Sequence, residues 1–166
     1  MTQENTNNKA KYNVFQVANC FIEIFKENKR QLTHMQLQKL VYYAYAFYLY
    51  DKNKELFESK FHPWAFGPVD ADLYKEIKSS NNSTFNIIYP LSVESFNCSC
   101  DSPELKEISD YINKAFGTWT AYELSELTHQ PGSAWDIARQ RETDILDNYD
   151  IKKEVSSIID KVKANS

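Results

Sequence analysis

Apolar residues near the start of the chain recur every three or four positions, which is the period of an amphipathic helix. Over residues 12–29 this stripe consists of Val14, Val17, Ala18, Phe21, Ile22 and Phe25. A polar link then leads to Thr33 and, three residues later, Gln36, a pair typical of a capping box. The pattern predicts a first helix over residues 12–29 and a second helix that begins at Thr33.

The second predicted helix carries apolar and aromatic residues on nearly all of its sides. Its apolar positions are Met35, Leu37, Leu40, Val41, Ala44, Phe47 and Tyr48, and further tyrosines lie between them. A helix that is apolar all round is buried on several sides, so we expect this one at the centre of the core. An aromatic pocket for a cofactor is the alternative interpretation, and the core interpretation is favoured.

The segment 61–69 alternates aromatic side chains with others and contains two prolines, which exclude a helix interior. Such alternation predicts a short strand, and Pro63 places this strand at the edge of a sheet. Gly67 is expected to end the strand, and a third helix follows over residues 69–79. Residues 85–89 are the candidate partner strand.

Start and stop signals predict four more helices in the second half of the chain. Ser102 opens one helix and Gly117 stops it, while Thr120 opens another as part of a second capping box. A short helix is expected from Ser133, and a final amphipathic helix over about residues 150–163.

Together these elements predict a mainly α fold, a compact single-domain helical fold with a small β-hairpin or short edge strands. The number of helices is about six to seven. Residues 1–11 are polar and are expected to form a disordered tail, and residues 12–164 are expected to form the single domain.

Charge is distributed unevenly along the 166 residues, whose formal net charge is −4. Residues 1–60 hold nine Lys and Arg against six Asp and Glu, whereas residues 61–166 hold ten against seventeen. Neither part has the concentrated basic face by which proteins bind nucleic acid. The acidic part is suited to a basic protein partner, although solvated helix faces are the more common reason for such an asymmetry.

Composition also bears on the compartment. No uninterrupted apolar run approaches the length of about 18 residues that a membrane span requires, so no membrane partner is expected. The cysteines are three in number, at positions 20, 98 and 100. This odd count argues against a disulfide framework and favours a reducing, cytoplasmic setting.

Motifs of the common enzyme classes are missing from the sequence, which has no Gly-rich phosphate loop, GxSxG elbow or HExxH pair. Nothing in the sequence signals that Cys20 is a nucleophile beside His34 or His129. The spacing of the potential metal ligands is poor; these are His34, His62, His129, Cys98 and Cys100. We therefore expect a protein that is not an enzyme, with no catalytic residues, no metal and no other cofactor.

Several short motifs nevertheless occur in a recognisable order. They are LQKLVYYA from Leu37, WAFGPV from Trp64, Leu73-Tyr74, ELSELTH from Glu123, and Trp135. In this order and spacing they resemble the SocA-like, or Panacea, antitoxin domain, which also occurs in phage-associated proteins. The similarity covers about residues 12–140. One position departs from the family pattern, because Ala134 stands where proline commonly precedes the tryptophan.

The resemblance implies an antitoxin that neutralises a cognate toxin by direct protein–protein contact. Delivery of the toxin to a protease is a further form that this role takes in the family, so a protease is a second expected partner. A phage-derived adaptor or inhibitor of another host protein is the first alternative. An unrecognised small hydrolase is the second and least favoured alternative, because the resemblance supplies no catalytic residues.

Five residues of the motifs are candidates for binding the partner protein: Trp64, Phe66, Pro68, His129 and Trp135. Tryptophan is among the residues most enriched in interface hot spots, but a place in the core is favoured for Trp64. His129 follows a helix end, where bonding to the last free carbonyl groups is the simpler role.

The acidic total and the missing basic stripe predict negligible affinity for DNA. In a gel-shift assay with the DNA upstream of its own gene, submicromolar protein should give no shift at about 150 mM salt. A shifted band that persists at this salt concentration would contradict the prediction.

Overall fold

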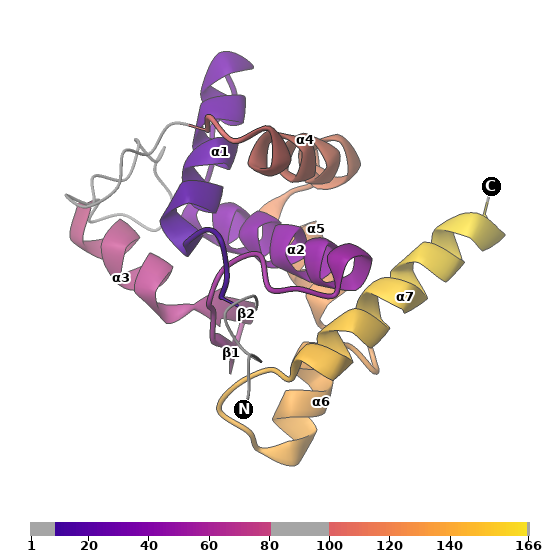
Figure 1. The fold of residues 1–166 in the computed structure, drawn as a ribbon. Helices are drawn as coiled ribbons and strands as arrows, with labels where there is room; N and C mark the ends of the chain where they lie inside the picture. Colours follow the sequence, from indigo (N-terminus) through magenta and orange to yellow (C-terminus); the bar gives the residue numbers. More distant parts are fainter. Residues whose placement is uncertain (1–8, 81–99, 166) are drawn as a thin grey trace, which may run out of the picture.

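A computed structural model describes residues 9–80 and 100–165, and the account that follows is confined to them. In chain order the elements are α1 (Val14–Glu27), α2 (His34–Lys52), β1 (Phe61–Trp64), β2 (Gly67–Asp70), α3 (Ala71–Ser80), α4 (Pro103–Phe116), α5 (Ala121–Thr128), α6 (Ala134–Arg141) and α7 (Asn148–Ala164). Figure 1 shows the helices gathered around α2, with the hairpin beside it. The predicted mainly α fold with a small hairpin is confirmed.

Helix α2 is the centre of the fold. It contacts α1, α3, α4, α5, α7 and strand β2, so it is surrounded on most sides. Every residue from 37 to 49 is buried. The tyrosine rings pack on other core rings, as in the 5.1 Å centroid separation of Tyr42 and Phe61 and the 5.0 Å stacking of Tyr43 on Phe116. These rings form the core, as the sequence favours, because each fills space against a neighbouring element.

Side-chain caps fix several of the predicted helix starts. Thr33 accepts a hydrogen bond from the Gln36 amide at 3.1 Å, but the Gln36 side chain donates to the Trp119 carbonyl instead of completing a capping box. The box at Thr120 and Glu123 is complete, as predicted. Gly117 ends α4 as expected, but with a right-handed backbone (φ −66°) and not the left-handed form usual for such a glycine.

The two strands form an antiparallel hairpin of consecutive segments, and here the sequence prediction is wrong in detail. Gly67, expected to end the only strand of this region, begins the second one and pairs with Trp64. Its φ of +111° lets the chain reverse within two residues, a conformation that favours glycine. Alternation identified the first strand correctly, but it could not show that the strand folds back on its own continuation.

Several sequence predictions fall on residues outside the described ranges. They concern most of the tail 1–11, the strand expected over 85–89, and Cys98. In the part of the chain that the structure describes, none of the helices combines the length and apolar character needed to cross a membrane.

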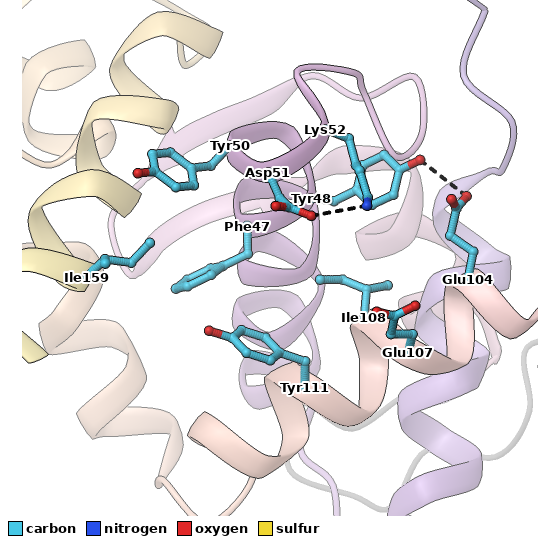
Figure 2. Close-up of a pocket in the computed structure, with 10 residues that line it drawn as sticks. All are labelled: Phe47, Tyr48, Tyr50, Asp51, Lys52, Glu104, Glu107, Ile108, Tyr111 and Ile159. Atoms are coloured by element: carbon cyan, nitrogen blue, oxygen red, sulfur yellow. Dashed lines mark hydrogen bonds and ion pairs between the residues drawn. The ribbon is translucent and has the colours of Figure 1, made fainter. Parts of the chain in front are cut away.

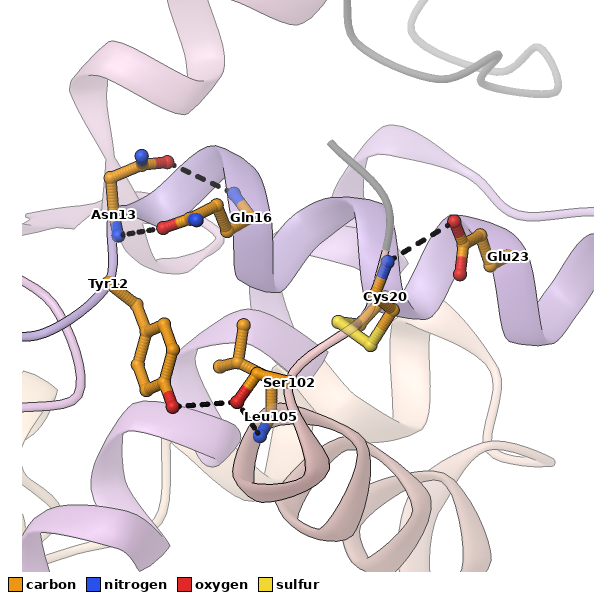
Figure 3. The surroundings of a disulfide bond; sticks show 8 residues. Tyr12, Asn13, Gln16, Cys20, Glu23, Ser102 and Leu105 are labelled. Atoms are coloured by element: carbon orange, nitrogen blue, oxygen red, sulfur yellow. Dashed lines mark hydrogen bonds between the residues drawn. A yellow bond between two sulfur atoms is a disulfide. The ribbon is translucent and has the colours of Figure 1, made fainter. Parts of the chain in front are cut away.

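A disulfide joins Cys20 of α1 to Cys100, just before α4, contrary to the expectation from the cysteine count (Figure 3). Helices α1 and α4 pack together, which brings these two positions side by side. Next to the bridge, the Cys100 amide donates to a Glu23 carboxylate oxygen at 3.4 Å, and the Tyr12 hydroxyl lies 2.7 Å from that of Ser102. An odd count leaves one cysteine over but does not prevent one bridge, so it gives no argument for a reducing compartment.

The carboxylate of Glu154 is buried beside the tyrosines of the core. Glu154 of α7 is 6% exposed and accepts hydrogen bonds from the Tyr42 hydroxyl at 2.6 Å and the Ala134 amide at 3.4 Å, both through Oε2. Its other oxygen has no hydrogen-bond partner among the described residues. Burial raises the pKa of Glu154 from 4.5 to about 7, because the ionised form loses its hydration.

This raised pKa predicts a pH-dependent loss of stability. The unfolded chain releases the Glu154 proton at lower pH than the folded chain, so stability falls as the pH rises from 4.5 to about 7. One pKa unit corresponds to about 1.4 kcal/mol, so at about pH 8 Glu154→Gln should be up to 3 kcal/mol more stable than wild type. Urea unfolding at about pH 4.5 should show little difference. Equal differences at both pH values would contradict the prediction.

Candidate functional site

The structure brings the five sequence candidates together around the hairpin. Trp64 ends β1, Pro68 lies in β2, and Phe66 is in the turn between the strands. His129 directly follows α5, and Trp135 lies in α6. The Trp135 indole Nε1 donates a hydrogen bond to the Trp64 carbonyl at 2.7 Å, and the His129 Nε2 lies 3.0 Å from the Ala65 carbonyl oxygen.

These two bonds belong to a larger set that holds the hairpin backbone. The Arg139 guanidinium donates to the Pro63 carbonyl at 3.1 Å, the Ser125 hydroxyl to the Phe66 carbonyl at 2.9 Å, and the Lys39 ammonium to the Pro68 carbonyl at 3.0 Å. We call the five side chains that contact these carbonyls the hairpin anchors: Lys39, Ser125, His129, Trp135 and Arg139. They come from α2, from α5 and its end, and from α6, so three separate helices meet the hairpin.

Gln38 of α2 adds a sixth attachment, to strand β2. Its carboxamide accepts from the Asp70 amide at 3.0 Å and donates to the Asp70 carbonyl at 3.3 Å, so it pairs with the strand as a neighbouring backbone would. The Asp70 carboxylate then accepts from the Leu73 amide at 2.9 Å, at the start of α3. Burial raises the pKa of Asp70, and the hydrogen bond from the Leu73 amide to its carboxylate opposes the rise.

Lys39 is the most deeply buried of the anchors, at 1% exposure. Burial lowers the pKa of its ammonium from 10.5 to about 7, because the charge has lost its water. The nearby His34 is also buried, and burial together with the Lys39 charge lowers its pKa to about 4. A lysine buried at this cost needs a compensating hydrogen bond, and the Pro68 carbonyl supplies one.

His129 lies between two acceptors. Its Nδ1 faces the Ser125 carbonyl oxygen and its Nε2 faces that of Ala65. A neutral imidazole has one N–H and can donate to only one of these carbonyls, whereas the imidazolium form donates to both. The ring also packs on Trp135 with a centroid separation of 3.9 Å. The contact with the Ser125 carbonyl is of the helix-end kind expected for His129, and the contact with the Ala65 carbonyl links the ring to the hairpin.

The candidates differ in how far they reach solvent. Phe66 at the turn is 65% exposed and Trp64 is 40% exposed, while Pro68 is buried and His129 and Trp135 are partly buried. One side of the Trp64 ring packs edge-on against Tyr74, with the centroids 5.1 Å apart. The anchors thus bind the hairpin on its side toward α2, α5 and α6, and the aromatic residues Trp64 and Phe66 at its tip are exposed.

Within residues 9–80 and 100–165, no three His, Cys, Asp or Glu side chains are grouped so that they could hold a metal ion. Cys20, considered as a nucleophile near His34 or His129, is bonded to Cys100 instead.

Sequence reasoning missed four of the residues that hold the hairpin: Gln38, Lys39, Ser125 and Arg139. A signal for the first two was present, because an amide and an ammonium stand in the middle of an apolar stretch of α2. Polar groups in such a place are buried and must find hydrogen-bond partners. The partners themselves lie about 30 positions further along the chain, in strand β2, and no local pattern identifies them.

Fold and site together define a mainly helical protein in which side chains from several short motifs bind the backbone of one hairpin. Residues 37–136, which include four of the five anchors, match the model of the family described as the SocA-like antitoxin, Panacea domain. The chain belongs to this family, which confirms the resemblance seen in the motifs. It is 26% identical to Antitoxin SocA from Caulobacter vibrioides (strain NA1000 / CB15N) over 127 residues, which cover 73% of this chain and 67% of the relative. No solved structure matches the chain.

The close approach of Lys39 and Thr128 to Gly67 predicts that even a methyl group at this position destabilises the fold. A Cβ at this position would lie 2.6 Å from the Thr128 Oγ1 and 2.7 Å from the Lys39 Cε, and moving Lys39 breaks its bond to Pro68. Gly67→Ala should lower the free energy of unfolding by about 2–4 kcal/mol.

Gly132→Ala is the matched control. Gly132 also has a positive φ, +82°, but nothing lies within 4 Å of an added Cβ. This substitution should cost only about 1 kcal/mol, from backbone strain alone. Urea unfolding of both variants measures the difference, and equal losses would show that the anchors leave room at Gly67.

Proposed function

We propose that the chain is an antitoxin that neutralises a cognate toxin by direct contact, with the hairpin tip as a principal contact surface. The proposal takes residues 12–164 as a single domain. One observation carries it: five side chains from three helices hold the hairpin backbone while Trp64 and Phe66 at the tip remain open to solvent.

The chemistry of the tip supports this role. Large aromatic residues are enriched among interface hot spots, and they bind best when little conformational entropy is lost on association. A hairpin tip fixed by hydrogen bonds loses little, because its backbone is already ordered. Each neutral hydrogen bond contributes about 1 kcal/mol, so the set of anchors stabilises the tip substantially although a two-stranded hairpin alone is marginal.

The family relationship supplies the kind of partner. The relative from Caulobacter vibrioides is named an antitoxin, and we infer the same role here. The anchors bind backbone carbonyls and not a reacting group, which is in keeping with a protein that acts by binding and not by catalysis. We propose that binding alone neutralises the toxin; rescue that depends on a host protease would instead assign the adaptor form of the role.

Co-expression with the toxic neighbour from its own locus tests the proposal. Wild-type protein should restore growth and should bind the purified neighbour. Phe66→Ala should reduce binding and rescue by at least tenfold, because it removes a large exposed ring. Truncating such a ring at an interface hot spot causes a loss of binding of about this size. The melting temperature of this variant should stay close to that of wild type, since the ring is 65% exposed.

Tyr149→Ala is the control for this experiment. Tyr149 is 69% exposed at the start of α7 and is not one of the residues at the hairpin tip, so its loss should leave rescue intact. Soluble wild-type protein that neither binds the neighbour nor relieves its toxicity would remove the antitoxin proposal. Full rescue by Phe66→Ala would remove the hairpin tip from it.

A further inference from the structure

A second surface lies at the other end of α2, where a groove of about 320 Å³ opens between the last turns of α2, helix α4 and helix α7 (Figure 2). Helix α2 forms one side with Phe47, Tyr48, Tyr50, Asp51 and Lys52, and α4 and α7 contribute the others. Gln38 and the anchor Lys39 lie near the opposite end of the same helix. At 1.5 Å per residue, Lys39 and Asp51 are about 18 Å apart along its axis, so this groove is separate from the hairpin site.

The floor and walls of the groove are apolar and aromatic. Phe47 forms part of the floor at 8% exposure, and its ring centroid is 5.8 Å from that of Tyr111. Tyr111, which is 55% exposed, and Tyr50, which is 42% exposed, also line the groove. Ile108 and Ile159 complete the apolar lining. In the described part of the chain, the hydroxyls of Tyr50 and Tyr111 have no hydrogen-bond partner, so both are available to a ligand.

The rim of the groove is acidic. Asp51, Glu104 and Glu107 line it against the single ammonium of Lys52, which lies 3.3 Å from the Asp51 carboxylate. The Glu104 carboxylate is occupied in part, because it accepts from the Tyr12 hydroxyl at 3.1 Å and the Tyr48 hydroxyl at 3.2 Å. Glu107 has no hydrogen bond or ion pair to any described residue. A negative charge without a partner therefore lies one helical turn before the exposed Tyr111, on the same face of α4.

We propose that this groove binds an arginine-bearing apolar segment of the toxin, as a contact surface in addition to the hairpin tip. The inference rests on the proposed function for the identity of the partner. Arginine fits all three features of the groove. Its guanidinium pairs with a carboxylate through two parallel hydrogen bonds, it stacks on tyrosine faces, and the apolar residues beside it fill the floor. An acidic segment would be repelled by the rim, and a purely apolar one would leave Glu107 buried without a partner.

A synthetic peptide tests the groove independently of the toxin. The probe is a fluorescent helical peptide of about 14 residues with leucines on one face and arginines on the other, and its affinity for the full chain is measured by fluorescence anisotropy. We expect the peptide to bind wild type, and to bind less tightly as salt is raised from about 50 to 500 mM. The same peptide with glutamate in place of arginine should not bind.

The variant Glu107→Arg/Tyr111→Ala should weaken binding of the arginine peptide by at least about tenfold. Its matched control is Tyr122→Ala/Glu126→Arg on α5, where an exposed tyrosine and glutamate have the same four-residue spacing and the change in net charge is identical. The control should bind the peptide as wild type does. Equal weakening in both variants, or no binding by wild type, would overturn the groove assignment.

The toxin itself separates this inference from the proposed function. If wild type binds the purified neighbour and Glu107→Arg/Tyr111→Ala binds it at least about tenfold less tightly, both proposals are supported. If wild type binds the neighbour and the groove variant binds it equally well, the groove assignment is wrong and the antitoxin proposal remains. If wild type does not bind the neighbour, the antitoxin proposal fails, and with it the assignment of the groove to a toxin.

Discussion

Burial of polar groups on a central apolar helix is the constraint on which the rest of this structure depends. Helix α2 is enclosed by its neighbours, so Gln38 and Lys39 cannot be satisfied by water. A buried amide or ammonium without a partner costs several kcal/mol. This cost is a large part of the net free energy of unfolding of a small domain. The hairpin backbone supplies the hydrogen-bond partners, and the same hydrogen bonds fix strand β2 against α2.

The hairpin in turn depends on the helices that follow it. Two short strands have little stability of their own, and the carbonyls of this hairpin face helices instead of further strands. Helix α2 binds strand β2, and the remaining carbonyl contacts of the hairpin come from Ser125, His129, Trp135 and Arg139. In this chain the motif residues therefore meet at one place, around a hairpin tip whose two aromatic residues, Trp64 and Phe66, are exposed.

The sequence predicted the helices well because each carries its own signals, such as the capping box at Thr120 and the apolar stripe of α1. It could not predict contacts between distant positions. The pairing of β1 with β2, the Cys20–Cys100 bridge and the bond from Lys39 to Pro68 all depend on how the elements pack. Trp64 and Trp135 belong to two different motifs, and only the structure shows that a hydrogen bond joins them.

Hydrogen–deuterium exchange of the chain, alone and bound to the purified product of the neighbouring toxic gene, tests the central claim most directly. Exchange reports the protection of backbone amides, so it locates a contact without any substitution that could disturb the anchors. The account predicts that peptides covering residues 61–70 become strongly protected in the complex. A stable complex in which these peptides exchange as in the free protein, while other parts of the chain become protected, would contradict it.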